Sequence, residues 1–242
     1  MKDNVEKRNG AVAVLELVGF ENAWRKETAE IILAVLGKVH DRVMKAYKKP
    51  PPQKKWPETD EPETMVVGEQ VYVAIPSEHP ASLLVMSVVL YDLLYAFFES
   101  KIMFSGAVSY GPFFLGDGRL YGPTVDDAAR WKGYADWMGV ISTPRTNYVI
   151  DRLSTKPVEM NFIPVSYYLK YAIPCRDGSI RRMNCLNWPV WLQASFKKTP
   201  EKGAKSIARQ WMEGIFAAQE HFGMEMFTRF ENTLAFIDHA MD

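Results

Sequence analysis

The run Ala11–Val18 constrains the fold most, because seven of its eight residues are apolar and three are β-branched. A strand of this kind is covered on both faces, since a strand with one solvated face alternates apolar and polar residues. The chain therefore needs a sheet with other elements packed on both sides. Glu16 is the exception within the run, and an ionised carboxylate there is costly unless a cation or strong donors compensate it. Glu16 is thus a candidate ligand of a metal ion, or else it lies at an edge with its side chain in water.

The first half of the chain alternates between strand and helix patterns. Apolar residues at helical spacing predict an amphipathic helix over about residues 22–47. Residues 48–63 contain five prolines among charged residues, which predicts an exposed loop. The runs 64–67 and 71–75 predict a hairpin with Glu69 at its tip. A second core helix is predicted over about residues 80–99.

The second half continues this alternation. Residues 102–110 and 140–142 predict strands, and Gly116, Asp117 and Gly118 predict a turn within 113–121. Thr124 is a plausible N-cap for a helix that runs to about Trp137. Strand character returns over 162–174 and 179–188, with a turn at 177–178, and a helical pattern covers 204–241. We therefore expect an α/β (α+β) protein with helices on a mainly antiparallel sheet. Its domain covers residues 1–200, and residues 201–242 form a helical appendage for packing or dimerisation.

Composition excludes several partners. Lys plus Arg equals Asp plus Glu at 29 each, so no global charge draws the chain to nucleic acid or to an anionic membrane. The two cysteines, Cys175 and Cys185, are too few for a disulfide framework, which fits a reducing cytoplasm. The apolar stretch 83–98 is short for a bilayer and is split by Asp92, so it predicts a core helix and no membrane span. The four histidines show no metal-ligand spacing.

Residues around Glu16 form a candidate phosphate and metal site. The backbone N–H groups of Val18, Gly19 and Phe20 lead into the first predicted helix and can face an anion at its N-terminus. Glu69, at the tip of the neighbouring hairpin, can complete a two-carboxylate site of the kind that holds Mg²⁺ against a triphosphate. The alternative for Glu69 is an ordinary polar turn residue.

Three ordered motifs favour the functional interpretation. They are Val14-Leu15-Glu16-Leu17-Val18-Gly19-Phe20, then Val67-Gly68-Glu69-Gln70-Val71, and finally residues 104–111 with Tyr121-Gly122-Pro123-Thr124-Val125-Asp126-Asp127-Ala128-Ala129-Arg130. In this order, over about residues 11–143, they resemble the two metal-binding motifs and the arginine motif of the class III nucleotidyl cyclases.

The resemblance implies a fold, a reaction and an assembly. The fold is a ferredoxin-like core, and the reaction converts a nucleoside triphosphate to a 3′,5′-cyclic monophosphate and pyrophosphate. The roles that it implies are metal binding (Mg²⁺ or Mn²⁺) by Glu16, Leu17 and Glu69, triphosphate binding by Val18, Gly19 and Phe20, ribose or phosphate orientation by Asp126, and transition-state stabilisation by Arg130. A head-to-tail homodimer is also implied, in which Arg130 serves carboxylates of the partner chain. The alternative for Asp126 and Arg130 is a local ion pair, since they stand four apart on a helix.

The sequence departs from the family at the base-reading positions and at the metal ligands. Met65 and Arg119 replace the lysine and aspartate that read adenine, and the donors of Arg119 suit uracil or cytosine carbonyls better. Arg119 as a solvated hairpin charge is the competing interpretation. A short cyclase domain without an adenine code, with Trp131 and the segment Ala135-Asp136-Trp137-Met138-Gly139 after the arginine motif, resembles the bacterial Pycsar pyrimidine cyclases. This resemblance implies synthesis of cyclic UMP or cyclic CMP, with UTP the preferred substrate, for a separate effector in anti-phage defence. Glu16 and Glu69 stand where the family has aspartates, so a non-catalytic nucleotide sensor is the main alternative, and a purine cyclase is a third.

Overall fold

The structure is a computed structural model, and it describes residues 5–18, 28–48, 59–155, 167–196, 206–217 and 223–242. In these ranges eight strands form one sheet, in which seven follow the order β2-β3-β1-β4-β6-β8-β7 and β5 pairs with β4. The strands are β1 (Glu6–Val18), β2 (Glu63–Val67), β3 (Gln70–Pro76), β4 (Met103–Gly116), β5 (Arg119–Tyr121), β6 (Val140–Ser142), β7 (Tyr168–Pro174) and β8 (Ile180–Leu186). The β4–β6 pair is parallel and the other described pairs are antiparallel, which confirms the predicted mainly antiparallel sheet.

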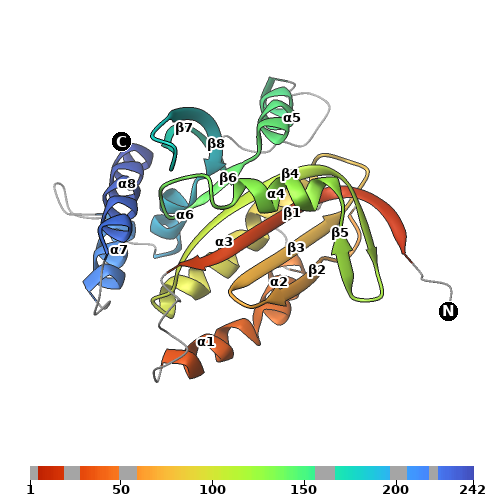
Figure 1. Ribbon diagram of the computed structural model, residues 1–242, viewed down its shortest axis with the longest axis horizontal. Coiled ribbons are helices and arrows are strands. Elements are labelled where there is room, and N and C mark those ends of the chain that lie inside the picture. The colour runs from red at the N-terminus through yellow and green to blue at the C-terminus, as the bar shows by residue number, and fades with distance from the viewer. Residues whose placement is uncertain (1–4, 19–27, 49–58, 156–166, 197–205, 218–222) are drawn as a thin grey trace.

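The first four strands form the predicted ferredoxin-like core. Helices α1 (Thr28–Leu36) and α2 (Val39–Tyr47) follow β1, and α3 (Ser82–Glu99) connects β3 to β4. The resulting sequence order β-α-β-β-α-β, with strand order β2-β3-β1-β4, is that of a ferredoxin-like fold. Figure 1 shows α2 and α3 on one side of the sheet and α4 (Pro123–Trp131) on the other.

β1 lies at the centre of this core, between β3 and β4. Its side chains alternate between two apolar clusters, because successive residues of a strand point to opposite faces. Leu15 and Leu17 pack in the large cluster that includes α2 and α3, whereas Val12 and Val14 pack with residues of α4. A Cβ on Gly106 of β4 would lie 2.6 Å from the Leu15 side chain and 2.9 Å from the Val14 carbonyl oxygen, so only glycine fits against β1 there.

The β2–β3 hairpin is present as predicted. Its turn needs a left-handed residue, which Gly68 supplies with φ +59°. β3 then pairs with β1 from Gly10 opposite Pro76 to Glu16 opposite Gln70.

The first predicted helix is two helices in the structure. α1 ends at Leu36 and α2 begins at Val39, with a turn at Gly37 and Lys38 between them. The amide of Lys38 donates to the Val35 carbonyl, an i to i−3 bond that tightens the chain and ends the first helix. The start of the predicted helix, residues 22–27, and most of the proline-rich loop lie outside the described residues.

The helix after β5 differs from its prediction at both ends. Its N-cap is Gly122, and the Thr124 hydroxyl donates to the Pro112 carbonyl of β4 instead of capping the helix. The helix ends at Trp131, six residues before Trp137. Beyond it, Ala135 forms a β-bridge with Cys175, which draws this segment away from a helical path.

Two further helices were not predicted. They are α5 (Pro144–Thr155), which packs on β6 and β8, and α6 (Trp188–Ser195). The C-terminal pattern contains α7 (Ile207–Ala217) and α8 (Met224–Met241), and residues 218–222 between them lie outside the described ranges.

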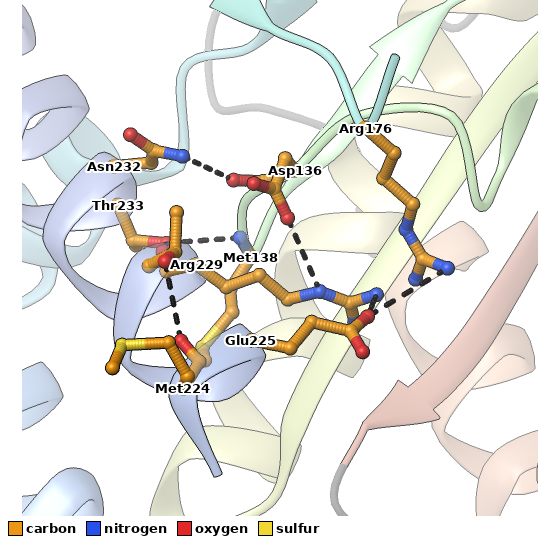
Figure 2. Close-up of polar contacts among 9 residues, drawn as sticks. Asp136, Met138, Arg176, Met224, Glu225, Arg229, Asn232 and Thr233 are labelled. Carbon is orange, nitrogen blue, oxygen red and sulfur yellow. Dashed lines mark hydrogen bonds and ion pairs between the residues drawn. The ribbon is translucent and has the colours of Figure 1, made fainter. Parts of the chain in front are cut away.

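Helix α8 is fastened to the segment that follows α4. The Asn232 side chain donates to the Asp136 carbonyl at 2.7 Å, and the Met138 amide donates to the Thr233 hydroxyl at 2.9 Å. The guanidinium of Arg229, which is 5% exposed, lies 3.6 Å from Asp136 and 2.8 Å from Glu225 (Figure 2). Phe236 packs edge-on against Trp137 in the same contact. This helix therefore shares the core of the sheet, while the division at residue 200 stays a prediction.

One described helix, α3, is long and apolar enough to cross a membrane. Because 72% of this 18-residue helix is buried inside the protein, it serves as a core helix here.

Candidate active site

The two candidate metal carboxylates lie on adjoining backbone. Glu16 is opposite Gln70 in the β1–β3 register, and Glu69 precedes Gln70 in the hairpin turn. The Leu17 amide donates to the Glu69 carbonyl at 2.9 Å, so β1 holds the turn directly. The predicted neighbourhood of Glu16 and Glu69 is thus present in the backbone, and the convergence of their carboxylates stays a prediction.

The Glu16 side chain lies on the α4 face of the sheet, because it continues the alternation of Val12 and Val14. Two polar side chains lie beside it there. Ser105 of β4 is directly opposite Glu16, and its buried hydroxyl has no hydrogen-bond partner among the described residues. Tyr72 of β3 shares this face, and burial, together with the nearby Glu16 charge, raises the pKa of its hydroxyl.

A lysine that the sequence analysis did not single out contacts this carboxylate. Lys132 Nζ lies 2.6 Å from Glu16 Oε1, and the two side chains are only 12% and 25% exposed. Lys132 directly follows α4, and its amide donates to the Ala128 carbonyl at the end of that helix. The only hint in the sequence was a cation two residues after Arg130, because the pair joins positions 116 residues apart.

These groups fit a divalent cation in their chemistry. Carboxylate and hydroxyl oxygens are the donors that Mg²⁺ and Mn²⁺ take, usually one or two carboxylates with substrate phosphates and water completing the shell. Glu16 and Ser105, which lie opposite each other on β1 and β4, supply such donors, and Glu69 adds a carboxylate from the adjoining hairpin turn. No group of three or more acidic, histidine or cysteine side chains that could hold a metal ion gathers in the described ranges.

Helix α4 presents the other predicted catalytic residues to solvent. Asp126 and Arg130 are both exposed, and no ion pair joins them. The local ion pair, which was the alternative to the catalytic interpretation, is therefore not formed between these two residues. The position of α4 is fixed by two sets of contacts. Its own Val125 and Ala128 pack in the apolar cluster with Val12 and Val14 of β1, and the Ser109 hydroxyl of β4 donates to the Asp127 carboxylate at 2.8 Å.

The two candidate base-reading positions line one cavity of about 160 Å³ between the β2–β3 and β4–β5 hairpins. Met65 lies on β2 opposite Tyr72, and Arg119 begins β5. Glu63 and Thr64 add a carboxylate and a hydroxyl to the lining. The structure thus brings Met65 and Arg119 together, although 54 residues separate them in the sequence.

Of the predicted triphosphate contacts, Val18 ends β1, whereas Gly19 and Phe20 lie outside the described residues. A larger cavity of about 460 Å³ lies between α2, α3 and α6. Five of its eleven lining residues are aromatic, including Tyr91 and Trp191, and none is a predicted site residue that the structure describes.

No known family profile matches the sequence. The search of curated proteins found no match either.

Three solved structures resemble the fold. An adenylate/guanylate cyclase/hydrolase from Silicibacter pomeroyi is 12% identical, with 75% of this chain and 96% of that chain covered and a TM-score of 0.45. The catalytic core of a rhodopsin-guanylyl cyclase with converted specificity, in complex with ATPαS, is 14% identical, with 76% and 97% covered and a TM-score of 0.48. A bacterial light-regulated adenylyl cyclase is 13% identical, with 76% and 92% covered and a TM-score of 0.44. Each of these three TM-scores lies below 0.5, and each sequence identity lies below 25%.

Proposed function

We propose that the chain is a nucleotidyl cyclase that converts a nucleoside triphosphate to the 3′,5′-cyclic monophosphate and pyrophosphate. The observation that carries the proposal is the hydrogen bond from Leu17 to Glu69, which joins the first two acidic motifs at one end of β1. The third motif supports it, because α4 packs on the face of β1 that carries Glu16 and leaves Arg130 exposed.

In the proposed reaction the ribose 3′-oxygen attacks the α-phosphorus, the bond from that phosphorus to the bridging oxygen breaks, and pyrophosphate leaves. The 3′-hydroxyl proton passes to water. A divalent cation bound by Glu16 and Glu69 would lower the pKa of that hydroxyl and offset triphosphate charge. Asp126 accepts a hydrogen bond from a ribose hydroxyl, and Arg130 donates to the α-phosphoryl oxygens as their charge grows. Val18, with Gly19 and Phe20, offers backbone N–H groups to the triphosphate.

We further infer a pyrimidine substrate, UTP or CTP. Arg119 carries only donors, which match the carbonyl oxygens of these bases and do not match the amino group of adenine. Its place beside Met65 in one small cavity supports a base-reading role, and its exposed side chain is accessible to a nucleotide. By its resemblance to Pycsar cyclases the product would be a messenger in anti-phage defence, read by a separate effector.

Arg130 is exposed on the surface of α4, which suits a role across an interface. We propose a head-to-tail homodimer in which Arg130 of one chain completes a site whose carboxylates belong to its partner.

A non-catalytic nucleotide sensor is the second candidate, and the Glu16–Lys132 ion pair favours it. The ammonium already neutralises one of the two carboxylates in the absence of metal. Such a protein would bind nucleotide without turnover.

Incubation of the purified protein with ATP, GTP, CTP and UTP, each with Mg²⁺ or Mn²⁺, separates these functions when products are identified by mass. Cyclic UMP or cyclic CMP with pyrophosphate is the expected result. Cyclic AMP or cyclic GMP would instead make it a purine cyclase. Binding with no cyclic product from any nucleotide would replace the cyclase proposal with the sensor.

A further inference from the structure

The Glu16–Lys132 pair differs from the other lysine–carboxylate ion pair of the described residues. Lys170 and Asp151 lie at a similar distance, 2.7 Å, but their side chains are 44% and 46% exposed. The Glu16–Lys132 pair is 25% and 12% exposed at 2.6 Å. Water therefore screens the attraction between the Glu16 carboxylate and the Lys132 ammonium less than the attraction between Lys170 and Asp151. Removing one charge of the Glu16–Lys132 pair should affect the other charge more strongly.

The partial burial of Glu16, whose side chain is 25% exposed, explains why a cation is favourable there. Val12 and Val14 precede it on the same face, and the buried Ser105 hydroxyl opposite has no hydrogen-bond partner in the part of the chain that the structure describes. A carboxylate among such neighbours cannot be fully hydrated, and an uncompensated charge would be costly. Lys132 supplies the compensating charge from the end of α4.

Lys132 is also held in place by its backbone. Its amide closes the last turn of α4, and its own φ and ψ of −54° and −38° are helical. The stem of the side chain therefore starts from a fixed point, which lowers the entropy cost of keeping the ammonium on Glu16.

We propose that Lys132 is the resident counter-cation of Glu16 and that a divalent metal ion must displace its ammonium to bind this carboxylate. The inference rests on the proposed function, in which Glu16 is a metal ligand. It follows because an ammonium within hydrogen-bond distance of Oε1 both occupies that oxygen and repels a second cation. Lys132 is thus a positioning residue that sets the metal affinity of the free protein.

The test measures Mn²⁺ binding without nucleotide, from the electron paramagnetic resonance signal of free Mn²⁺. Lys132→Met should bind Mn²⁺ more tightly than the unmodified protein, on the order of tenfold, because the competing charge is gone. Lys132→Gln, which keeps polarity without charge, should show the same direction. Lys170→Met removes a lysine from the exposed ion pair and is the matched control, with no expected change. Glu16→Gln should lose the site.

The outcomes separate the two proposals. Equal Mn²⁺ affinity in Lys132→Met and the unmodified protein, with loss in Glu16→Gln, would overturn the role of Lys132 and leave the metal site intact. Unchanged binding in Glu16→Gln would remove Glu16 as a ligand, and both proposals would fall. If the Lys132 variants fail to fold, the unmodified protein still decides: the ¹⁵Nζ resonance of Lys132 should shift on addition of Mg²⁺, and a constant resonance at saturating Mg²⁺ would contradict displacement.

Discussion

At the scale of single residues, two cations near the C-terminal end of α4 differ in their surroundings. Lys132 is committed to an internal ion pair, whereas Arg130, two positions earlier, is exposed. A guanidinium free to meet a substrate can serve the transition state without first breaking an internal contact. The two cations at the end of one helix therefore have different proposed tasks.

Arg130→Ala should lower kcat by about 10²-fold or more and leave the nucleotide Kd nearly unchanged, because the donor acts on charge that develops only in the transition state. Single-turnover kinetics and equilibrium binding separate the two effects. Arg182→Ala, which removes an exposed arginine on β8, is the control. A variant with weaker binding and an unaltered rate would assign Arg130 to ground-state binding.

Arg119→Ala should reduce the preference for pyrimidine over purine nucleotides by on the order of tenfold, the size expected for one lost hydrogen bond to a base. Ratios of kcat/KM for the four nucleotides measure this preference. The metal dependence should not change, because Arg119 lies in the hairpin cavity. An unaltered nucleotide ranking would leave Arg119 as a solvated charge.

At the scale of elements, α8 stabilises the segment between α4 and β6. Its buried Arg229 reaches both Asp136 and Glu225, although Nε lies too far from Asp136 for a hydrogen bond. Burial raises the pKa of the Asp136 carboxyl, and the Arg176 charge opposes this. Through Arg229, helix α8 therefore contacts the partly buried Asp136 carboxylate, which lies four residues after Lys132.

Arg229→Met should lower the free energy of unfolding by about 1–3 kcal/mol, since it leaves the Asp136 carboxylate without its closest cation. Urea denaturation measures the change. Arg209→Met on α7 is the comparison, because Arg209 also pairs with two carboxylates but is 26% exposed at its side chain and should matter less. Equal losses in the two variants would mean that the burial of Arg229 contributes nothing.

At the scale of the whole molecule, the proposed dimer divides each active site between two chains. One site needs Glu16 of the first chain and Arg130 of the second, so two different inactive variants can complement each other.

Arg130→Ala and Glu16→Gln, each inactive alone, should regain about a quarter of the unmodified rate when mixed in equal amounts after subunit exchange. Random pairing makes about half the dimers mixed, and each mixed dimer holds one intact site of two. Light scattering checks that dimers form. The control is the Arg130→Ala variant taken through the same exchange procedure without the Glu16→Gln variant. No recovery in a mixture shown to exchange subunits would place both residues in the same chain's site.

The sequence by itself determined the elements whose patterns are local. The apolar run of β1, the Gly68 turn and the order of the core elements follow from side-chain periodicity and from backbone conformations that few residues adopt. The neighbourhood of Glu16 and Glu69 was expected from the resemblance of their motifs to those of the cyclases, because local patterns do not set the pairing of β1 with β3.

Only the tertiary structure decided where α4 ends and which groups the charged residues at its end contact. Trp137 fits a helical pattern, but burial against Phe236 and the bridge of Ala135 to Cys175 outweigh a few tenths of a kcal/mol of local helix propensity. Likewise the contact of Lys132 with Glu16 depends on how α4 packs across β1. Periodicity encodes which face of an element is buried, but the partners of a charge depend on elements distant in sequence, which only packing brings together.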